Sequence, residues 1–206
     1  MALSAEKFNQ GMTPQEYIDQ IKVNKQPFID SYKAVEIPVE TRSLFDGLAQ
    51  PLNMAVFTAD WCSDAVSTTP AILRLAESTD KLSVKVFNLD EELALILPET
   101  RAGTVPVFAV LDPTMQEIAR FIETANELVP SIDAMYEMIG KEITGESEET
   151  ARTGVRGRRT AFRVSHAKEW DYVILKAFHQ VVVDGLAPPP PSDRPAVGGT
   201  KWPQDN

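Results

Sequence analysis

The sequence predicts an α/β protein built around a mixed β-sheet, and two observations support this fold class. Between residues 51 and 143, short apolar runs alternate with stretches of helical periodicity, in the order strand, helix, strand, helix, strand, strand, helix. A strand–helix–strand unit implies a parallel pair joined by a right-handed crossover. A hairpin after residue 112 adds antiparallel strands, so we expect a mixed sheet flanked by helices.

Each predicted element has a local signal. Residues 52–59 form an apolar run between Pro51 and Asp60, which is typical of a buried strand. Residues 82–89 alternate in polarity and are rich in β-branched side chains, which indicates a second strand. The predicted strands are 52–59, 82–89, 105–112 and 116–122, and the predicted helices that accompany them are 62–78, 91–99 and 125–143.

The composition is that of a globular chain that is large enough to bury a core without disulfide bonds. The 206 residues are 43 % hydrophobic and 24 % charged, and the formal net charge is −10. An acidic chain is repelled by nucleic-acid phosphates and by anionic lipids, so neither nucleic acid nor a membrane is an expected partner. The first residues lack a signal-peptide core, and no run is long enough to span a membrane, so the expected compartment is the cytoplasm.

The single cysteine, Cys62, limits the chemistry of the chain. One thiol cannot form an internal disulfide, and it excludes a cysteine-rich zinc site. The two histidines, His166 and His179, lie far along the chain from it, so we expect no metal site. In a reducing cytoplasm the thiol stays free.

Residues 1–50 are predicted to form a helical N-terminal extension. Thr13 and Pro14 are a favourable N-cap and first helical residue, and apolar side chains recur at roughly helical spacing as far as Tyr32. A further short helix is predicted over residues 39–48.

Three segments follow the α/β unit of residues 51–143. Residues 144–159 are polar, with an acidic half and then a basic half, and are predicted to be a linker. Residues 160–185 predict an amphipathic helix whose apolar stripe packs on this chain or forms a homodimer interface. Residues 186–206 are rich in proline and glycine and are expected to be extended or disordered.

Four arginines of the predicted linker admit two interpretations. They are either a patch for phosphate or carboxylate groups or a solvated loop that balances the neighbouring glutamates, and we favour the second interpretation. The residues are Arg152, Arg156, Arg158 and Arg159.

Four features of the α/β unit resemble the thioredoxin family. Trp61-Cys62 follows the first predicted strand and opens a helix, as in the family's WCGPC motif, and Pro70 matches its helix-kinking proline. The sequence NLD at 88–90 ends the second strand as the family's NID segment does. GTVP at 103–106 resembles the loop with the family's cis-proline, and its proline follows Cys62 by the usual 44 residues. DWCSDA is most similar to a bacterial thioredoxin-like branch whose motif reads DWCGDA.

Three residues depart from the family's pattern, and the departures are consistent with one another. Ala65 stands in place of the resolving cysteine, and Asp64 stands in place of the motif's proline. Val56 occupies the position of the buried aspartate that helps to deprotonate the second thiol. A chain without a second thiol has no use for that aspartate.

One thiol permits a restricted redox chemistry. A mixed disulfide formed at Cys62 would persist until an outside thiol resolved it. Two reactions therefore remain open to this chain. One is monothiol exchange with glutathione or another small thiol as co-substrate, and the other is oxidation of Cys62 to a sulfenic acid. The start of the predicted helix 62–78 favours the thiolate, whereas Asp60 and Asp64 oppose it, so we expect the Cys62 thiol to have a pKa near the usual value of about 8.5. Arg101, distant from the loop in sequence, is a candidate cation that folding would have to bring close to Cys62.

The alternative hypothesis is a non-catalytic peptide- or protein-binding module. The resemblance implies that the backbone of Val105 pairs with an extended peptide beside a cis Val105–Pro106 bond, and such pairing requires no thiol. The candidate binding residues are Trp61, Ser63, Asp64, Val105 and Pro106, and the candidate nucleophile is Cys62. The sequence leaves open whether the protein is an enzyme, and its expected partner is a protein or peptide, with a thiol or disulfide under the first hypothesis.

Overall fold

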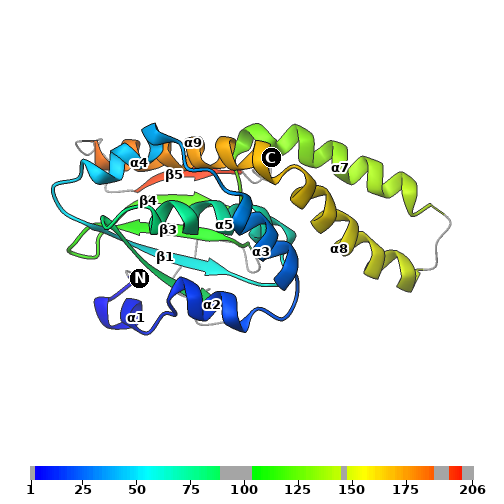
Figure 1. Cartoon of the computed structure of the whole chain (residues 1–206), viewed down its shortest axis with the longest axis horizontal. Coiled ribbons are helices and arrows are strands. Elements are labelled where there is room, and N and C mark those ends of the chain that lie inside the picture. Colours follow the sequence, from blue (N-terminus) through cyan, green and yellow to red (C-terminus); the bar gives the residue numbers. More distant parts are fainter. Residues whose placement is uncertain (1–2, 89–103, 145–147, 188–194, 201–206) are drawn as a thin grey trace, which may run out of the picture.

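A five-stranded sheet organises the chain in this computed structural model, which describes residues 3–88, 104–144, 148–187 and 195–200 (Figure 1). The strands are β1 (Leu52–Thr58), β2 (Leu82–Asn88), β3 (Val107–Leu111), β4 (Glu117–Ile122) and β5 (Ala196–Gly199). The helices are α1 (Ala5–Asn9), α2 (Pro14–Gln20), α3 (Lys25–Ala34), α4 (Val39–Asp46), α5 (Ser63–Glu77), α7 (Val129–Glu142), α8 (Glu148–Ser165) and α9 (Ala167–Leu186), with a 3-10 turn η1 (Asn126–Leu128) before α7.

The strand order is β2-β1-β3-β4-β5, with both parallel and antiparallel neighbours. β1 runs parallel to β2 and antiparallel to β3, and β4 is antiparallel to β3. The register places Val56 of β1 between Val86 and Phe108. The predicted mixed sheet flanked by helices is confirmed.

The two faces of the sheet carry separate apolar clusters because side chains alternate along each strand. Met54 and Val56 of β1 belong to the larger cluster, which packs under α3, α5 and α9. Ala55 and Phe57 point to the opposite face, where Phe8 of α1 joins them. The N-terminal and C-terminal helices are therefore part of the packing of the sheet.

Residues 14–34 form two helices, α2 and α3, where the apolar spacing suggested one continuous stretch. Thr13 forms a capping box with Glu16 at the start of α2, as its position before Pro14 predicted. The helix ends at Gln20, and the chain turns through Asn24, which has a left-handed φ of 60°, before α3 begins. This turn lies against the loop that follows β1, because the N–H groups of Lys22 and Val23 donate to Asp60 of that loop.

The predicted polar linker over residues 144–159 is wrong, because the chain is helical from Glu148 onwards. Its acidic residues precede its basic residues, an order that suits the helix dipole. The long side chains also find partners on other helices. Arg159 lies over the ring of Tyr136 at 4.4 Å, and Arg158 contacts Glu142 at 3.7 Å. Tertiary contacts with α7 therefore hold a segment that looks solvated in the sequence.

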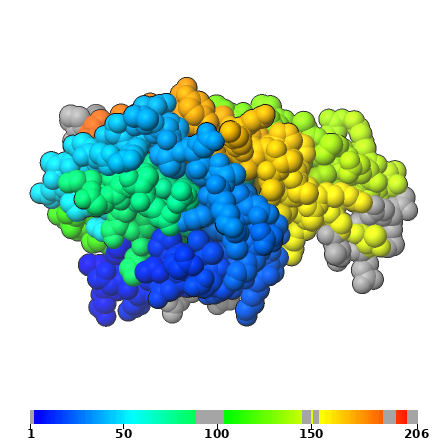
Figure 2. Space-filling model, in the orientation of Figure 1, coloured from blue at the N-terminus to red at the C-terminus, as the bar shows by residue number. Residues whose placement is uncertain are grey.

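The predicted helix over residues 160–185 is divided at His166 between α8 and α9. α7 and α8 project from the sheet as a pair, and α9 then returns across the sheet beside α5 (Figure 1). α8 also lies against the N-terminal helices, as the yellow and blue surfaces in Figure 2 show. The apolar stripe of α9 packs on its own chain, since Trp170, Ile174 and Phe178 are all buried.

The proline- and glycine-rich tail, expected to be extended or disordered, contributes the strand β5, so residues 196–199 are extended and belong to the sheet. β5 pairs in parallel with β4 at the edge of the sheet. Two glycines make this possible: a Cβ at Gly198 would lie 2.0 Å from Val181, and Gly199 has a φ of 95°. The predicted helix over residues 91–99 and Arg101 lie outside the described residues.

We expect Phe178→Ala to lower the free energy of unfolding by about 3–5 kcal/mol, the usual cost of deleting a buried aromatic side chain. The Phe178 ring is fully buried among Phe45, Phe108 and Phe121, with centroid distances of 5.9–6.3 Å. Urea unfolding of the wild type and of Phe178→Ala measures the effect. Tyr172→Ala is the control on the same helix, because Tyr172 is 51 % exposed and should change little. A loss below about 1 kcal/mol for Phe178→Ala would show that α9 is peripheral to the fold.

We expect Asp171→Asn to stabilise the protein at alkaline pH. Asp171 is buried on α9, neither carboxylate oxygen has a partner in the described structure, and burial raises its pKa from 3.8 to about 7. Its contribution to stability is therefore fully present below pH 3.8 and is lost as the pH rises to about 7. The amide removes this penalty, so at pH 8 the variant should gain up to about 4 kcal/mol.

The measurement for Asp171→Asn is thermal unfolding between pH 5 and pH 8. The exposed Asp80→Asn variant is the matched control, and it should show no pH-dependent gain. A stability difference between wild type and Asp171→Asn that is constant across this range would contradict the shifted pKa.

Candidate functional site

The loop from β1 to α5 is held in place by the N-terminal extension. Asp60 Oδ2 accepts hydrogen bonds from the backbone N–H groups of Lys22 at 2.9 Å and Val23 at 3.0 Å. The Asn24 side chain donates to the Asp60 carbonyl at 3.0 Å. These bonds account for the break between α2 and α3. The N–H groups of Lys22 and Val23 are outside both helices, and Asp60 supplies the acceptor that they would otherwise lack. Asp60 thus fixes the residues that lead to Cys62.

Cys62 is the N-cap residue of α5 and has an extended backbone conformation. Its thiol donates to the carbonyl oxygen of Val105 at 3.3 Å and lies 3.9 Å from Asp64 Oδ2. The Val105–Pro106 peptide bond is cis, as the resemblance implied. The first turn of α5 and the loop before β3 therefore meet at the sulfur atom.

The Cys62 thiol has a higher pKa than the sequence led us to expect. Burial, with a smaller contribution from the Asp64 charge, raises the pKa of Cys62 to about 11. The backbone N–H groups of Ala65 and Asp64 lower this pKa, but by less than burial raises it. The expected value of about 8.5 balanced the helix start against the carboxylates and left out burial, which only the folded chain reveals.

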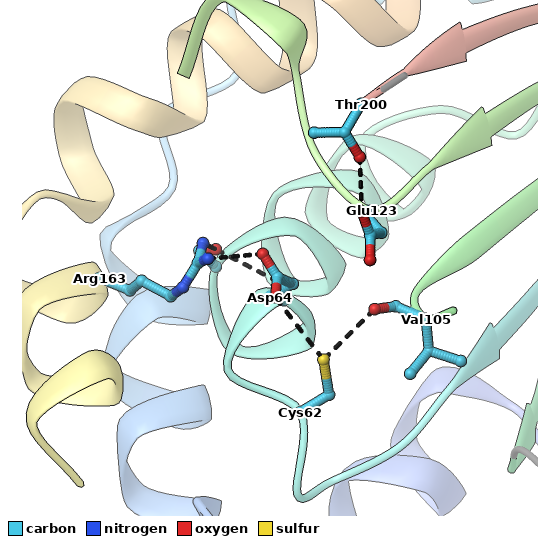
Figure 3. Close-up of polar contacts among 7 residues, drawn as sticks. Cys62, Asp64, Val105, Glu123, Arg163 and Thr200 are labelled. Atoms are coloured by element: carbon cyan, nitrogen blue, oxygen red, sulfur yellow. Dashed lines mark hydrogen bonds and ion pairs between the residues drawn. The ribbon is translucent and has the colours of Figure 1, made fainter. Parts of the chain in front are cut away.

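Arg163 of α8 is a member of the site that sequence analysis missed. Its guanidinium Nη2 lies 2.5 Å from Asp64 Oδ1, and its side chain is fully buried. Nη1 donates to Ser67 Oγ at 3.3 Å, and the guanidinium carbon lies 5.5 Å from the centre of the Trp170 ring. Figure 3 shows Asp64 between the Arg163 guanidinium and the Cys62 thiol.

Sequence spacing carried a signal for Arg163. It lies seven residues before Trp170, which is two helical turns, and so falls on the line of the predicted apolar stripe. A lone cation on an apolar stripe requires a buried counter-charge. The identity of the counter-charge, Asp64, follows only from the tertiary structure.

Glu123 is a second missed residue, and it lies at the end of β4 opposite α5. Its backbone N–H donates to the Pro106 carbonyl at 2.7 Å, and its Oε2 accepts a hydrogen bond from Thr200 Oγ1 at 2.6 Å (Figure 3). Burial raises the pKa of Glu123, and the Asp64 charge adds to this effect. Glu123 adopts a left-handed φ of 58°, an uncommon conformation for a residue other than glycine.

The predicted site residues are divided by exposure. Cys62, Ser63 and Asp64 are half-buried, whereas Val105 and Pro106 are buried. The Trp61 side chain is 44 % exposed at the rim of the loop. The structure thus brings the thiol and the cis-proline loop together, while the backbone of Val105 is not open to a peptide in this conformation.

The described residues contain neither a metal cluster nor a membrane-spanning helix. No group of three or more histidine, cysteine or carboxylate side chains among them could hold a metal ion. None of the helices in the described ranges is long and apolar enough to cross a membrane.

We expect Asp64→Asn to lower the apparent pKa of Cys62 by about one unit or more, because it removes the adjacent negative charge and leaves the Arg163 guanidinium facing the sulfur. The rate of iodoacetamide alkylation as a function of pH, followed by mass spectrometry, measures the shift. Ser67→Ala is the control, since it removes a neutral contact of Arg163 and should leave the profile unchanged. Circular dichroism checks that both variants fold. An Asp64→Asn profile identical to that of the wild type would contradict the electrostatic role of Asp64.

Comparisons with known proteins identify the fold and the family. A crystal structure of a protein of unknown function, PA1234 from Pseudomonas aeruginosa, matches 79 % of this chain and 99 % of its own, with a TM-score of 0.56 and 16 % identity. An HIV epitope scaffold matches 82 % of this chain and 96 % of its own, with a TM-score of 0.53 and 12 % identity. No curated protein sequence matches. The sequence model described as thioredoxin matches residues 11–136, more than half of the chain, so this protein belongs to the thioredoxin family.

Proposed function

We propose that this protein is a non-catalytic binding module on a thioredoxin fold, in which the Cys62 thiol fixes the active-site loop instead of exchanging disulfides. One observation carries the proposal. The thiol donates to the backbone carbonyl of Val105 at 3.3 Å. The Asp64 carboxylate, which is itself bound to Arg163, lies 3.9 Å from the sulfur. The sulfur thus has a structural hydrogen bond and an adjacent negative charge, and both favour the protonated form.

The protonation state of Cys62 argues against rapid exchange. The thiolate is the nucleophile in disulfide exchange. With a pKa of about 11, only about one thiol in 10⁴ is ionised at pH 7. The Asp64 carboxylate beside the thiol is already bound to the Arg163 guanidinium at 2.5 Å. A mixed disulfide at Cys62 could not be resolved within the chain, because Ala65 occupies the position where a second sulfur is needed.

The exposed part of the site suits a partner surface. Trp61 is 44 % exposed, beside the half-buried Ser63 and Asp64. Tryptophan is prominent among residues that dominate binding energy at protein interfaces. The acidic chain, with a formal net charge of −10, favours a basic partner. Pairing of a peptide with the Val105 backbone would require the loop to open, because Val105 is buried.

Monothiol exchange is the second candidate function, and one observation favours it. Cys62 retains the position at the start of α5, where the backbone N–H groups of Asp64 and Ala65 stabilise the thiolate. In this reaction the thiolate attacks a disulfide of glutathione and expels one thiolate, and an outside thiol later releases Cys62. Disulfide exchange that is slow at neutral pH and rapid only at strongly alkaline pH is consistent with this arrangement.

The proposal predicts no sustained reduction of insulin disulfides with thioredoxin reductase as the only reductant. It also predicts that glutathione disulfide at pH 7 adds to Cys62 no faster than to a short unstructured cysteine peptide, as measured by mass spectrometry. Ala65→Cys should give weak turnover at most, because the buried Val56 cannot act as the base. Cys62→Ala/Ala65→Cys is the control for a dithiol mechanism.

Fast glutathione addition at pH 7 would overturn the binding-module proposal in favour of monothiol catalysis. Sustained turnover by the wild-type chain with thioredoxin reductase alone would contradict both candidate functions. Addition that becomes rapid only near pH 11, with no turnover, is the result that supports it.

A further inference from the structure

A run of hydrogen bonds leads from the edge strand β5 to the acceptor of the Cys62 thiol. Thr200, which directly follows β5, donates from Oγ1 to Glu123 Oε2 at 2.6 Å. The backbone N–H of Glu123 donates to the Pro106 carbonyl at 2.7 Å. Val105, which precedes Pro106, accepts from the Cys62 thiol at 3.3 Å. Figure 3 shows Glu123 between Thr200 and Val105. Two hydrogen bonds thus separate the end of β5 from the cis-proline loop.

Glu123 is the link in this run, and it is held from both sides in an uncommon conformation. Its φ of 58° lies in the left-handed region, where a residue other than glycine persists only if its surroundings fix it. Thr200 binds its side chain, and Pro106 binds its N–H. The N–H of Thr200 also donates to the carbonyl of Ile122 at 3.1 Å. Loss of the contacts of Thr200 would therefore free the residue that holds the Pro106 carbonyl.

The seat of β5 depends on two glycines at positions of close approach. A Cβ at Gly199 would lie 2.0 Å from the carbonyl oxygen of Ile122 in β4. A Cβ at Gly198 would lie 2.0 Å from Val181 of α9. The absence of both side chains lets β5 lie against β4 and α9, and this placement brings Thr200 to Glu123.

Little apolar burial holds β5 in its seat. The strand has four residues, of which two are glycines with no side chain to bury. The Val197 side chain is 60 % exposed, and Ala196 is only partly buried against the core. Since burial of apolar surface is the main force that holds such an element, short edge segments open at a lower free energy than the core. β5 is therefore able to detach while the other strands stay paired.

We propose that residues 196–200 act as a strap that holds the cis-proline loop closed against Cys62, and that release of the strap opens the backbone of Val105. This inference rests on the function proposed above, because peptide pairing with Val105 requires the loop to open. It adds the segment that controls the opening. A partner that pairs with Val105 binds only the open state, so loosening the strap raises the population of the state that can bind.

Two variants of the full chain loosen the strap without changing the thiol loop. Gly199→Val places a Cβ against the Ile122 carbonyl, whereas Thr200→Val removes only the hydroxyl that binds Glu123. We expect the amide hydrogens of Val105 and Glu123 to exchange about tenfold faster in Gly199→Val and about threefold faster in Thr200→Val, as measured by NMR. The rate of Cys62 alkylation by iodoacetamide at a fixed pH should rise in the same order, because the open loop uncovers the sulfur.

Matched controls separate release of the strap from a general loss of stability. Gly11→Ala disturbs the opposite edge of the sheet, where a Cβ would lie 2.6 Å from Phe87 of β2, and it should leave both rates unchanged. Val197→Thr changes an exposed side chain of β5 and should also have no effect. The amide of Val56 in β1 should exchange as in the wild type in every variant, since the strap opens without unfolding the sheet.

The strap proposal is overturned if Gly199→Val changes neither the exchange at Val105 and Glu123 nor the alkylation of Cys62. It is equally overturned if Gly11→Ala accelerates both, or if exchange at Val56 rises by the same factor, because the opening would then be global. The glutathione experiment tests the binding-module proposal separately. A strap that opens as expected, in a chain that adds glutathione rapidly at pH 7, would support the strap and refute the binding module.

Discussion

The buried ion pair between Arg163 and Asp64 is the interaction on which the arrangement of the site depends. The Arg163 side chain is fully buried, and an unpaired guanidinium in that position would cost several kcal/mol. Its partner lies in the first turn of α5, so the ion pair joins α8 to α5, the helix on which α8 packs. Trp170 lies beneath the guanidinium and fixes the start of α9. One pair of charges thus joins the projecting helices to the thiol loop.

The same ion pair explains why the changed thioredoxin motif is internally consistent. Asp64 replaces the proline of the family motif and serves two neighbours, the guanidinium at 2.5 Å and the Cys62 thiol at 3.9 Å. A negative charge beside a buried thiol opposes ionisation. The dithiol mechanism requires surroundings that favour ionisation of the thiol, together with a second sulfur. Ala65 and the buried Val56 lack the groups that such a mechanism uses, so all three departures point away from disulfide turnover.

Both terminal regions of the chain contribute to the centre of the molecule. The turn between α2 and α3 supplies two N–H groups to Asp60, and it thereby holds the loop before Cys62. At the other end, Thr200 follows β5 and donates to Glu123, whose backbone contacts the carbonyl of Pro106. Segments nearly 180 residues apart thus secure the two loops that meet at the sulfur.

The sequence by itself determined the strands β1 to β4, the thioredoxin motif and the first turn of α5, because these depend on local periodicity and on spacings along the chain. Strand and helix signals in residues 51–143 needed no knowledge of distant contacts. The tertiary structure alone decided the helical state of residues 148–159, the strand at Ala196–Gly199 and the partnership of Arg163 with Asp64. Each of these depends on a neighbour far away in the sequence. Burial of Cys62 likewise results from packing, so its raised pKa could not be read from the motif.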